Sequence, residues 1–302
     1  MKKRIWLVAV VLALALLAAA LLDPTGTVLG LLYRESFYAG RPSHIWARAL
    51  RAADPGEQAT SVQQLKESGT AAIPVLIEIL SHRQDRAWDA AQARWKAAEL
   101  LGQLGPEGAP AAPALIAALD DPDLHVRTVA TTALGELRPA AATIVPVLTA
   151  RLDQEDRANT LRALSNFPDE ARTAVPVIVK LLRDDDPRVR WNAARTLGKI
   201  GPAAKEAVPA LIATLKDGES PVREHAAEAL GDLGPAAAEA VPSLIGTLQD
   251  ADAQVRRDTA RSLGQIGPAA RAAIPHLQTL EKDESNDVRE AARRSLRQLA
   301  PP

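Results

Sequence analysis

The sequence predicts an all-α fold, a solenoid of about eight antiparallel helix pairs that follows an N-terminal transmembrane helix. Three observations support this prediction. A proline-led unit recurs with a period close to 33 residues, each unit carries Ala- and Leu-rich stripes at helical spacing, and an uncharged apolar run lies near the N-terminus. The aromatic content of 3% agrees with it, because thin layers of helices pack through Ala and Leu and leave no thick core for large rings.

The apolar run covers residues 5–22, eighteen residues without a charge. This length reaches the roughly 17-residue lower limit for crossing a bilayer and exceeds the ~7–15 apolar residues of a signal peptide. Lys2, Lys3 and Arg4 predict that the preceding end stays cytoplasmic, so the chain from residue 23 onward faces outward. The alternative is cleavage at the Ala-rich site of residues 18–20. We therefore expect residues 1–22 to be a membrane anchor or signal peptide.

The repeat unit begins with a small apolar pair followed by proline. These prolines are Pro74, Pro113, Pro146, Pro176, Pro209, Pro242 and Pro275, with spacings of 39, 33, 30, 33, 33 and 33 residues. After each proline come an apolar run, an Asp-rich turn, in most units a Val-x-Arg or Val-Arg step, an Ala/Leu-rich run and, in most units, Gly-Pro-Ala-Ala. Such self-similarity is the signature of a stacked array, in which every unit buries its apolar stripe only against its neighbours.

Each unit predicts two antiparallel helices. Pro209 suits the first position of a helix, where its missing N–H costs nothing. Asp186 before Pro187 predicts an N-cap for the second helix, whose apolar stripe runs on to Ile200. Gly201 supplies a C-terminal stop. The ankyrin and tetratricopeptide signatures, which have similar periods, do not occur.

Residues 184–215 resemble a short HEAT repeat of the phycobilisome-lyase type, and the resemblance covers roughly residues 74 to 299. It implies an α-solenoid, which we expect over residues 74–302. Residues 44–73 form a degenerate pair that predicts an N-terminal cap, and Arg293 and Arg297 replace small residues in the C-terminal cap. Residues 23–43 predict a juxtamembrane linker whose Tyr33, Phe37 and Tyr38 pack on the first pair. The lead-in at residues 38–50 also resembles other membrane-anchored bacterial HEAT proteins.

Two polar positions recur together, an arginine and an aspartate six residues before it. They are Asp121, Asp184, Asp217, Asp250 and Asp283 with Arg127, Arg190, Arg223, Arg256 and Arg289. An anion-binding track is one interpretation. Because an aspartate accompanies each of these arginines at a constant spacing, we favour a structural ladder. In this ladder each arginine bridges turn carbonyls and carboxylates of adjacent repeats.

The outer positions of the second helices predict a partner-binding surface, since in HEAT-like arrays these helices line the concave face. Basic and acidic residues balance there, which disfavours nucleic acid. Tryptophan and arginine are typical of interface hot spots. The candidates are Trp95, Arg162, Trp191, Arg195, Lys199, Glu224, His225, Glu228 and Arg261. Trp88 is a further candidate, in a six-residue insertion that is either helical or a binding loop.

The pair Glu224-His225 raises the question of a metal site. Deoxyhypusine hydroxylase, built of similar repeats, binds iron through His-Glu dipeptides, but the order is reversed here and no second histidine occupies the slot. One imidazole does not hold iron, and the absence of cysteine excludes thiolate sites and disulfides. We therefore predict no metal and no cofactor.

Together these patterns predict a non-catalytic scaffold in the bacterial cell envelope, anchored through residues 5–22 with the repeat domain outside, or exported and soluble after cleavage. Its expected partner is a protein bound on the concave face, with no small-molecule substrate and no nucleic acid. The first alternative is a phycobilin-lyase-like enzyme or enzyme subunit, which the repeat type resembles. A deoxyhypusine-hydroxylase-like metalloenzyme and a nucleic-acid binder are the remaining alternatives.

Overall fold

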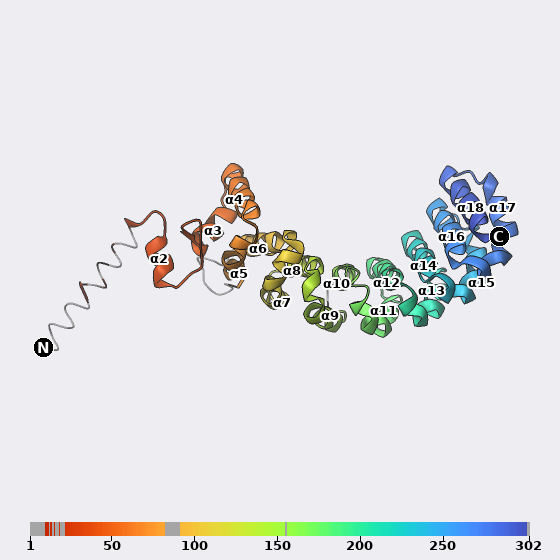
Figure 1. The fold of residues 1–302 in the computed structure, drawn as a ribbon, viewed down its shortest axis with the longest axis horizontal. Helices are drawn as coiled ribbons and strands as arrows, with labels where there is room; N and C mark the ends of the chain where they lie inside the picture. Colours follow the sequence, from red (N-terminus) through yellow and green to blue (C-terminus); the bar gives the residue numbers. More distant parts are fainter. Residues whose placement is uncertain are drawn as a thin grey trace. The chain divides into compact units, whose positions relative to one another are not determined.

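The computed structural model describes residues 22–81, 91–154 and 156–300, with a few isolated positions between residues 10 and 18 (Figure 1). The predicted membrane span of residues 5–22 falls mostly outside the described residues, and Trp88 falls outside them altogether. In the described part of the chain, no helix is long and apolar enough to cross a membrane.

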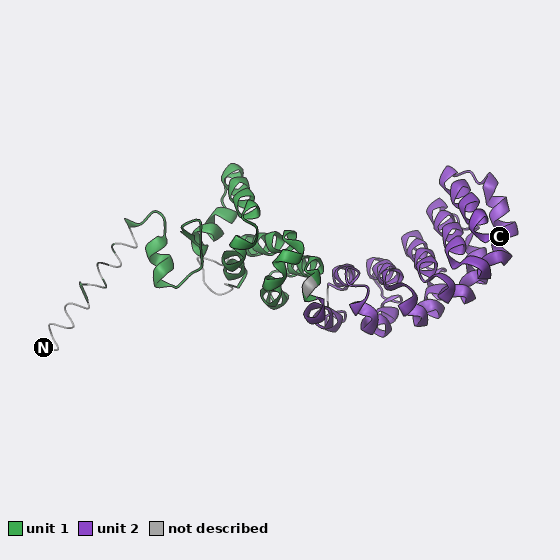
Figure 2. Cartoon of the chain, in the orientation of Figure 1, with its two compact units in different colours: residues 1–140 green, residues 141–302 purple. Residues whose placement is uncertain are grey.

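The chain forms two compact units, residues 1–140 and 141–302, shown in green and purple in Figure 2. Unit 1 contains a two-stranded hairpin, seven helices and short 3₁₀ segments among its described residues. These elements are α2 (Thr27–Leu32), β1 (Phe37–Tyr38), β2 (Arg41–Pro42), α3 (Ser43–Leu50), α4 (Pro55–Glu67), η1 (Gly69–Ala72), α5 (Ile73–Ser81), α6 (Ala91–Gln103), η2 (Gly105–Ala111), α7 (Ala112–Ala118), α8 (Leu124–Glu136) and η3 (Arg138–Ala140).

The segment predicted as a linker carries α2 and the antiparallel hairpin β1–β2. Tyr38 packs on Trp46 of α3 with the ring centroids 5.8 Å apart, and the Trp46 indole N–H donates to the Tyr38 carbonyl at 3.1 Å. Tyr33 does not pack as expected and is 75% exposed. The reason is that α2 approaches β2 through Gly30, where a Cβ would lie 2.4 Å from Pro42, so Gly30 is its buried residue.

Unit 2 continues the alternation of first and second helices. Its elements are α9 (Ala141–Ala150), α10 (Arg157–Leu164), η4 (Glu170–Ala174), α11 (Val175–Leu181), α12 (Pro187–Ile200), η5 (Gly201–Ala207), α13 (Val208–Thr214), α14 (Ser220–Asp232), η6 (Gly234–Ala240), α15 (Val241–Thr247), α16 (Ala253–Ile266), η7 (Gly267–Ala273), α17 (Ile274–Thr279), η8 (Leu280–Lys282) and α18 (Asn286–Leu299). Within this unit α12, α14, α16 and α18 lie side by side along the inner side of an arc, with the first helices outside them (Figure 1).

The caps predicted for α12 are present at both of its ends. The Asp186 side chain accepts the backbone N–H of Arg188 at 2.8 Å, and Pro187 begins α12. Gly201 ends α12 in the left-handed region, with φ of 67°. The segment that starts at this glycine then forms the 3₁₀ helix η5 and leads directly into α13, where the sequence had indicated only a helix stop.

Small residues let neighbouring second helices approach at backbone distance. A Cβ on Gly231 of α14 would lie 2.8 Å from the Cα of Ser262 on α16, and one on Gly264 would lie 2.9 Å from Ser295 Cβ on α18. In unit 1, Gly102 of α6 meets Ala133 of α8 in the same way, at 2.8 Å. This close approach fixes the distance between the solvent-exposed side chains of consecutive second helices.

Candidate functional site

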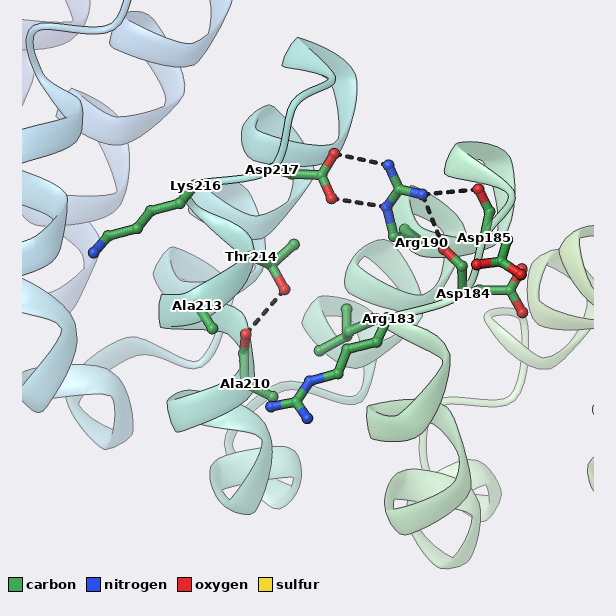
Figure 3. A pocket seen from close by; sticks show the side chains of 10 residues that line it. Arg183, Asp184, Asp185, Arg190, Ala210, Ala213, Thr214, Lys216 and Asp217 are labelled. Carbon is green, nitrogen blue, oxygen red and sulfur yellow. Dashed lines mark hydrogen bonds and ion pairs between the residues drawn. The ribbon is translucent and has the colours of Figure 1, made fainter.

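The arginine–aspartate ladder is formed by contacts between consecutive repeats, as Figure 3 shows for Arg190. Its Nε and Nη2 donate to the two carboxylate oxygens of Asp217 at 2.7 and 2.9 Å. Its Nη1 donates to the backbone carbonyls of Asp184 and Asp185 at 2.9 and 3.1 Å. The arginine thus binds the carbonyl of its own turn and the carboxylate of the next turn.

The same geometry recurs along unit 2. Arg223 holds the carboxylate of Asp250 at 2.7 and 2.8 Å, and Arg256 holds that of Asp283 at 2.9 Å through both nitrogens. The last arginine of the predicted set, Arg289, donates to the carbonyls of Asp283 and Glu284. In unit 1, Arg127 donates to the carbonyls of Asp121 and Pro122.

Two further members were missed from the sequence. Arg94 and Asp121 form a pair at 2.8 Å whose side chains are 2% and 0% exposed, and Arg157 lies 3.2 Å from Asp184. Neither arginine follows an aspartate by six residues, which was the criterion applied. The informative spacing is the 27 residues that separate each arginine from its carboxylate partner, and it selects both pairs.

Three ladder aspartates of unit 2, Asp217, Asp250 and Asp283, are stabilised in the ionised form. The Arg223 guanidinium lowers the pKa of Asp250, and the Arg256 guanidinium lowers that of Asp283. Burial opposes ionisation of Asp217, but the hydrogen bonds from Arg190 and the Glu219 N–H lower its pKa overall. A cavity of about 380 Å³ adjoins the pair shown in Figure 3, and the lining groups Arg190 and Asp217 already bind each other. This side of the unit is built for cohesion between repeats.

Residues predicted to bind a partner gather on the inner side of α12 and α14. The half-buried ring of Trp191 stacks on His225 with centroids 5.1 Å apart and 28° between the planes. His225 Nδ1 in turn lies 3.1 Å from Glu228 Oε2. Arg195 and Lys199 follow Trp191 on the same face of α12. We refer to Trp191, Arg195, Lys199, His225 and Glu228 as the α12–α14 face.

The acidic residues of α14 that were predicted to bind a partner are paired with arginines of α16. Glu224 lies 3.4 Å from Arg257, and Glu228 lies 3.4 Å from Arg261, both on the next second helix. The hydrogen bond from His225 lowers the pKa of Glu228, whereas burial and the neighbouring Asp258 raise the pKa of Glu224. Arginines of α16 therefore compensate much of the negative charge of α14.

The cations of α12 differ in this respect. Across the described part of unit 2, Arg195 has no hydrogen bond or ion pair, whereas the exposed Lys199 interacts electrostatically with the carboxylates of Glu228 and Asp232 on α14. Arg162 on α10 is less available, because it donates to the side-chain oxygen of Asn159 at 2.7 Å. The α12–α14 face therefore combines an aromatic platform with Arg195, a cation that has no hydrogen bond or ion pair in the described part of unit 2.

In unit 1, Trp95 contacts His125 of α8 edge-on, with centroids 4.9 Å apart. The Lys96 ammonium lies 4.2 Å from the Trp95 ring centroid. A cavity of about 530 Å³ opens beside the ring, between α6 and α8. The sequence had singled out Trp95 without His125, which belongs to the first turn of the following second helix and therefore has a different position in the repeat.

The described residues contain no group of three histidine or carboxylate side chains placed to hold a metal ion. His225 contacts Trp191 and Glu228. This arrangement orients the imidazole by stacking and one hydrogen bond.

Comparison with solved structures shows the same fold. An engineered protein is similar with a TM-score of 0.58 and 24% identity, over 85% of this chain and 78% of that chain. A Kap121p mutant gives a TM-score of 0.63 at 18% identity over 91% of this chain, and importin beta gives 0.59 at 15% identity over 86%. The chain spans 34% of the Kap121p structure and 41% of the importin beta structure.

A search of the curated proteins finds no match. The HEAT repeats family matches this chain in four overlapping segments, residues 44–135, 89–157, 141–231 and 208–297. These segments extend over most of the sequence and include both the predicted cap and the proline-led units. The chain therefore belongs to the HEAT-repeat family.

Proposed function

We propose that the chain is a non-catalytic scaffold that binds a partner protein on the inner face of its second helices. The observation that carries the proposal is the α12–α14 face, where Trp191 lies one turn from Arg195, which has no hydrogen bond or ion pair in the described part of unit 2. Aromatic and arginine side chains on one accessible face are the residue types that dominate binding energy in protein interfaces.

The chemistry of this face favours an acidic partner surface. The carboxylates of Glu224 and Glu228 are opposed by Arg257 and Arg261, so the uncompensated charge of this face is that of Arg195 on α12. A carboxylate of the partner would gain a charge-assisted hydrogen bond from Arg195, and an apolar side chain could cover the Trp191 ring.

Fold-level likeness supports a binding role in general terms. Kap95p, described as binding RanGDP, shares this fold with a TM-score of 0.57 at 14% identity, and this chain spans 40% of it. Shared architecture does not transfer a partner, so the proposal rests on the side chains of this chain. The short period of 33 residues supports assignment to the phycobilisome-lyase-type subgroup of HEAT repeats.

The proposal includes a location. The uncharged run at residues 5–22 and the preceding cations support an anchor in the cytoplasmic membrane of a bacterial envelope, with the repeats outside. A test is to place alkaline phosphatase after residue 302 and compare its activity with a fusion that lacks residues 1–22. Activity that is equal in both fusions would contradict an outward-facing array.

The proposed absence of catalysis rests on the sequence, which offers neither a cysteine nor a paired histidine at the His225 slot. The enzyme alternatives have separate signals. A lyase should change the visible absorbance of an added bilin, and a metalloenzyme should carry iron in elemental analysis of the purified chain. We expect neither signal.

The experiment that tests binding is capture of a partner from an envelope extract by the full chain in mild detergent. We expect a defined protein to bind the natural chain and to be lost with Trp191→Ala. The control is Lys205→Ala, which removes an exposed side chain of η5 outside the α12–α14 face. Equal recovery of the protein by all three chains would contradict the assignment to the α12–α14 face.

A further inference from the structure

The cavity beside Trp95 lies between α6 and α8 and is lined by residues from successive turns of both helices. Its apolar part consists of the Trp95 ring and the small side chains Val129 and Ala133. Gly102 completes the floor, and its missing side chain is required there because a Cβ would lie 2.8 Å from Ala133. The volume of about 530 Å³ is within the ~300–1,000 Å³ that is typical of ligand pockets.

The charged side chains that line this cavity are acidic. Glu99 and Glu136 both line it, and neither lysine nor arginine is among the lining residues. Glu136 is exposed and has no hydrogen bond or ion pair among the residues that the structure describes. The cavity therefore offers an aromatic wall, an apolar floor and one carboxylate whose charge is uncompensated.

A side chain of this chain already shows what the wall attracts. The Lys96 ammonium lies 4.2 Å from the Trp95 ring centroid and 3.1 Å from Glu99 Oε2. The ring and the neighbouring carboxylate thus hold one cation through a cation–π contact and an ion pair together. Lys96 is not part of the cavity lining, so the space itself stays available for a second cation near Glu136.

We propose that the cavity between α6 and α8 binds an arginine side chain from a basic segment of a partner protein. This inference rests on the proposed scaffold function and adds the chemistry of one contact to it. The aliphatic stem of the arginine lies against Val129 and Ala133, on the side of the cavity that leads to Trp95, and its guanidinium N–H groups donate to Glu136.

Arginine fits these features better than the alternatives. Its guanidinium is planar, more weakly hydrated than an ammonium, and its fork of N–H groups matches the two oxygens of a carboxylate. A neutral apolar ligand would cover the ring but leave the charge of Glu136 uncompensated, and an anion would be repelled by both carboxylates. Charge complementarity therefore selects a basic residue.

The test uses the full chain and two capped pentapeptides, acetyl-Gly-Ser-Arg-Ser-Gly-amide and the same peptide with citrulline. Citrulline keeps the shape of arginine and removes its charge. We follow the indole N–H signal of Trp95 by NMR, assigned from its loss in Trp95→Phe. We expect the arginine peptide to shift this signal with a Kd on the order of 1 mM, at least about fivefold lower than that of the citrulline peptide. Equal Kd values for the two peptides would overturn the inference.

Two charge-neutralising variants make the site assignment specific. Glu136→Gln should weaken the arginine peptide about fivefold without changing the citrulline peptide. Glu107→Gln is the matched control, because Glu107 is an exposed acid of unit 1 that does not line the cavity. Both acids are exposed, so neither variant endangers folding. A similar loss of affinity for the arginine peptide in both variants would show that the peptide responds only to the overall electrostatic field of the protein. That result would contradict the proposed contact with Glu136.

The result is separable from the scaffold function. If a partner protein is captured through Trp191 while the arginine peptide shows no preference over citrulline, this inference fails and the proposed function stands. If the peptide binds as expected and no partner is captured by the natural chain, the cavity assignment stands and the proposed function fails.

Discussion

Arg223 illustrates how single residues hold the array together. Its guanidinium donates two hydrogen bonds to Asp250 in the next unit and two to backbone carbonyls of its own turn. Its side chain is 16% exposed and that of Asp250 is 11% exposed, so the pair is shielded from solvent. Loss of one partner would leave a poorly solvated charge and two carbonyls without a donor.

We predict that Arg223→Met lowers the free energy of unfolding by about 2–4 kcal/mol. Arg188→Met is the control, because Arg188 pairs with Asp186 at 2.9 Å on the surface and is 77% exposed. Exposed pairs contribute roughly 0–1 kcal/mol, so this variant should unfold close to the natural chain. Urea unfolding measures both, and equal midpoints for the two variants would contradict a structural ladder.

The ladder also predicts a pH dependence. The pKa values of Asp250 and Asp283 are held below the ordinary value of 3.8 by Arg223 and Arg256. A lowered pKa in the folded state contributes stability that is present above the unfolded pKa and is lost as the pH falls through the folded pKa. The free energy of unfolding should therefore decrease below about pH 4. In Asp250→Asn the decrease should be smaller, and an unchanged pH profile would contradict the pairing.

At this scale the sequence was informative where a residue type repeats. The arginine slots and the Asp-rich turns are visible because their side chains carry out the same task in each unit. Arg94 and Arg157 were missed because no aspartate lies six residues before them, while their carboxylate partners lie 27 residues further on. Pairing of Glu224 with Arg257 was also missed, since the charges at one slot do not show which helix faces which.

The second helices meet through glycine and small residues, and this contact sets the spacing of the elements. A Cβ on Gly231 would approach Ser262 Oγ at 2.5 Å and Ser262 Cα at 2.8 Å. Since the second contact is with backbone, α14 and α16 could accommodate a methyl group only by moving apart.

We predict opposite effects for two glycine substitutions. Gly231→Ala should destabilise unit 2 by about 1–3 kcal/mol through overpacking. Gly246→Ala is the matched control, because Gly246 lies in α15 with nothing within 4 Å of the added Cβ. It should stabilise the helix by up to about 1 kcal/mol. Thermal unfolding compares the two variants, and a stabilised Gly231→Ala would show that the helices are not in close contact.

The order and type of the helices could be predicted from the proline, aspartate and glycine positions, which mark helix starts and stops directly. The 3₁₀ segments such as η5 (Gly201–Ala207) could not, because Gly-Pro stops an α-helix without specifying the conformation of the residues after it. Hairpin β1–β2 was missed as well, since two residues per strand are too few to show an alternating pattern.

For unit 2 as a whole, stability depends on stacking between neighbours. Helix α14 packs against α12 on one side and α16 on the other, whereas α18 packs against α16 among the described second helices. In such arrays each unit is stabilised chiefly by its immediate neighbours, so helices with two neighbours should open less often.

Hydrogen exchange measures this difference. We expect the backbone amides of α14 to exchange at least about tenfold more slowly than those of α18, which corresponds to about 1.4 kcal/mol. The comparison uses peptides from the middle of each helix, where fraying is smallest. Equal protection of α14 and α18 would indicate that unit 2 opens only as one cooperative body.

The overall architecture was readable from the sequence because the unit repeats, but the binding face was readable only in part. The candidate positions follow from the repeat register. Which of the charges stay uncompensated depends on contacts between units, as Arg195 on α12 and Glu228 on α14 show. The sequence had treated both as equivalent members of one surface.

The most direct measurement of the scaffold function is the affinity of the captured partner for charge-reversed chains at two salt concentrations. Arg195→Glu should weaken binding at least about tenfold, and the affinity of the natural chain should fall as salt increases. Lys205→Glu is the control, an exposed lysine of η5 away from the inner helices. The account predicts that Arg195→Glu loses affinity while Lys205→Glu does not. Equal affinities of both variants and the natural chain would contradict it.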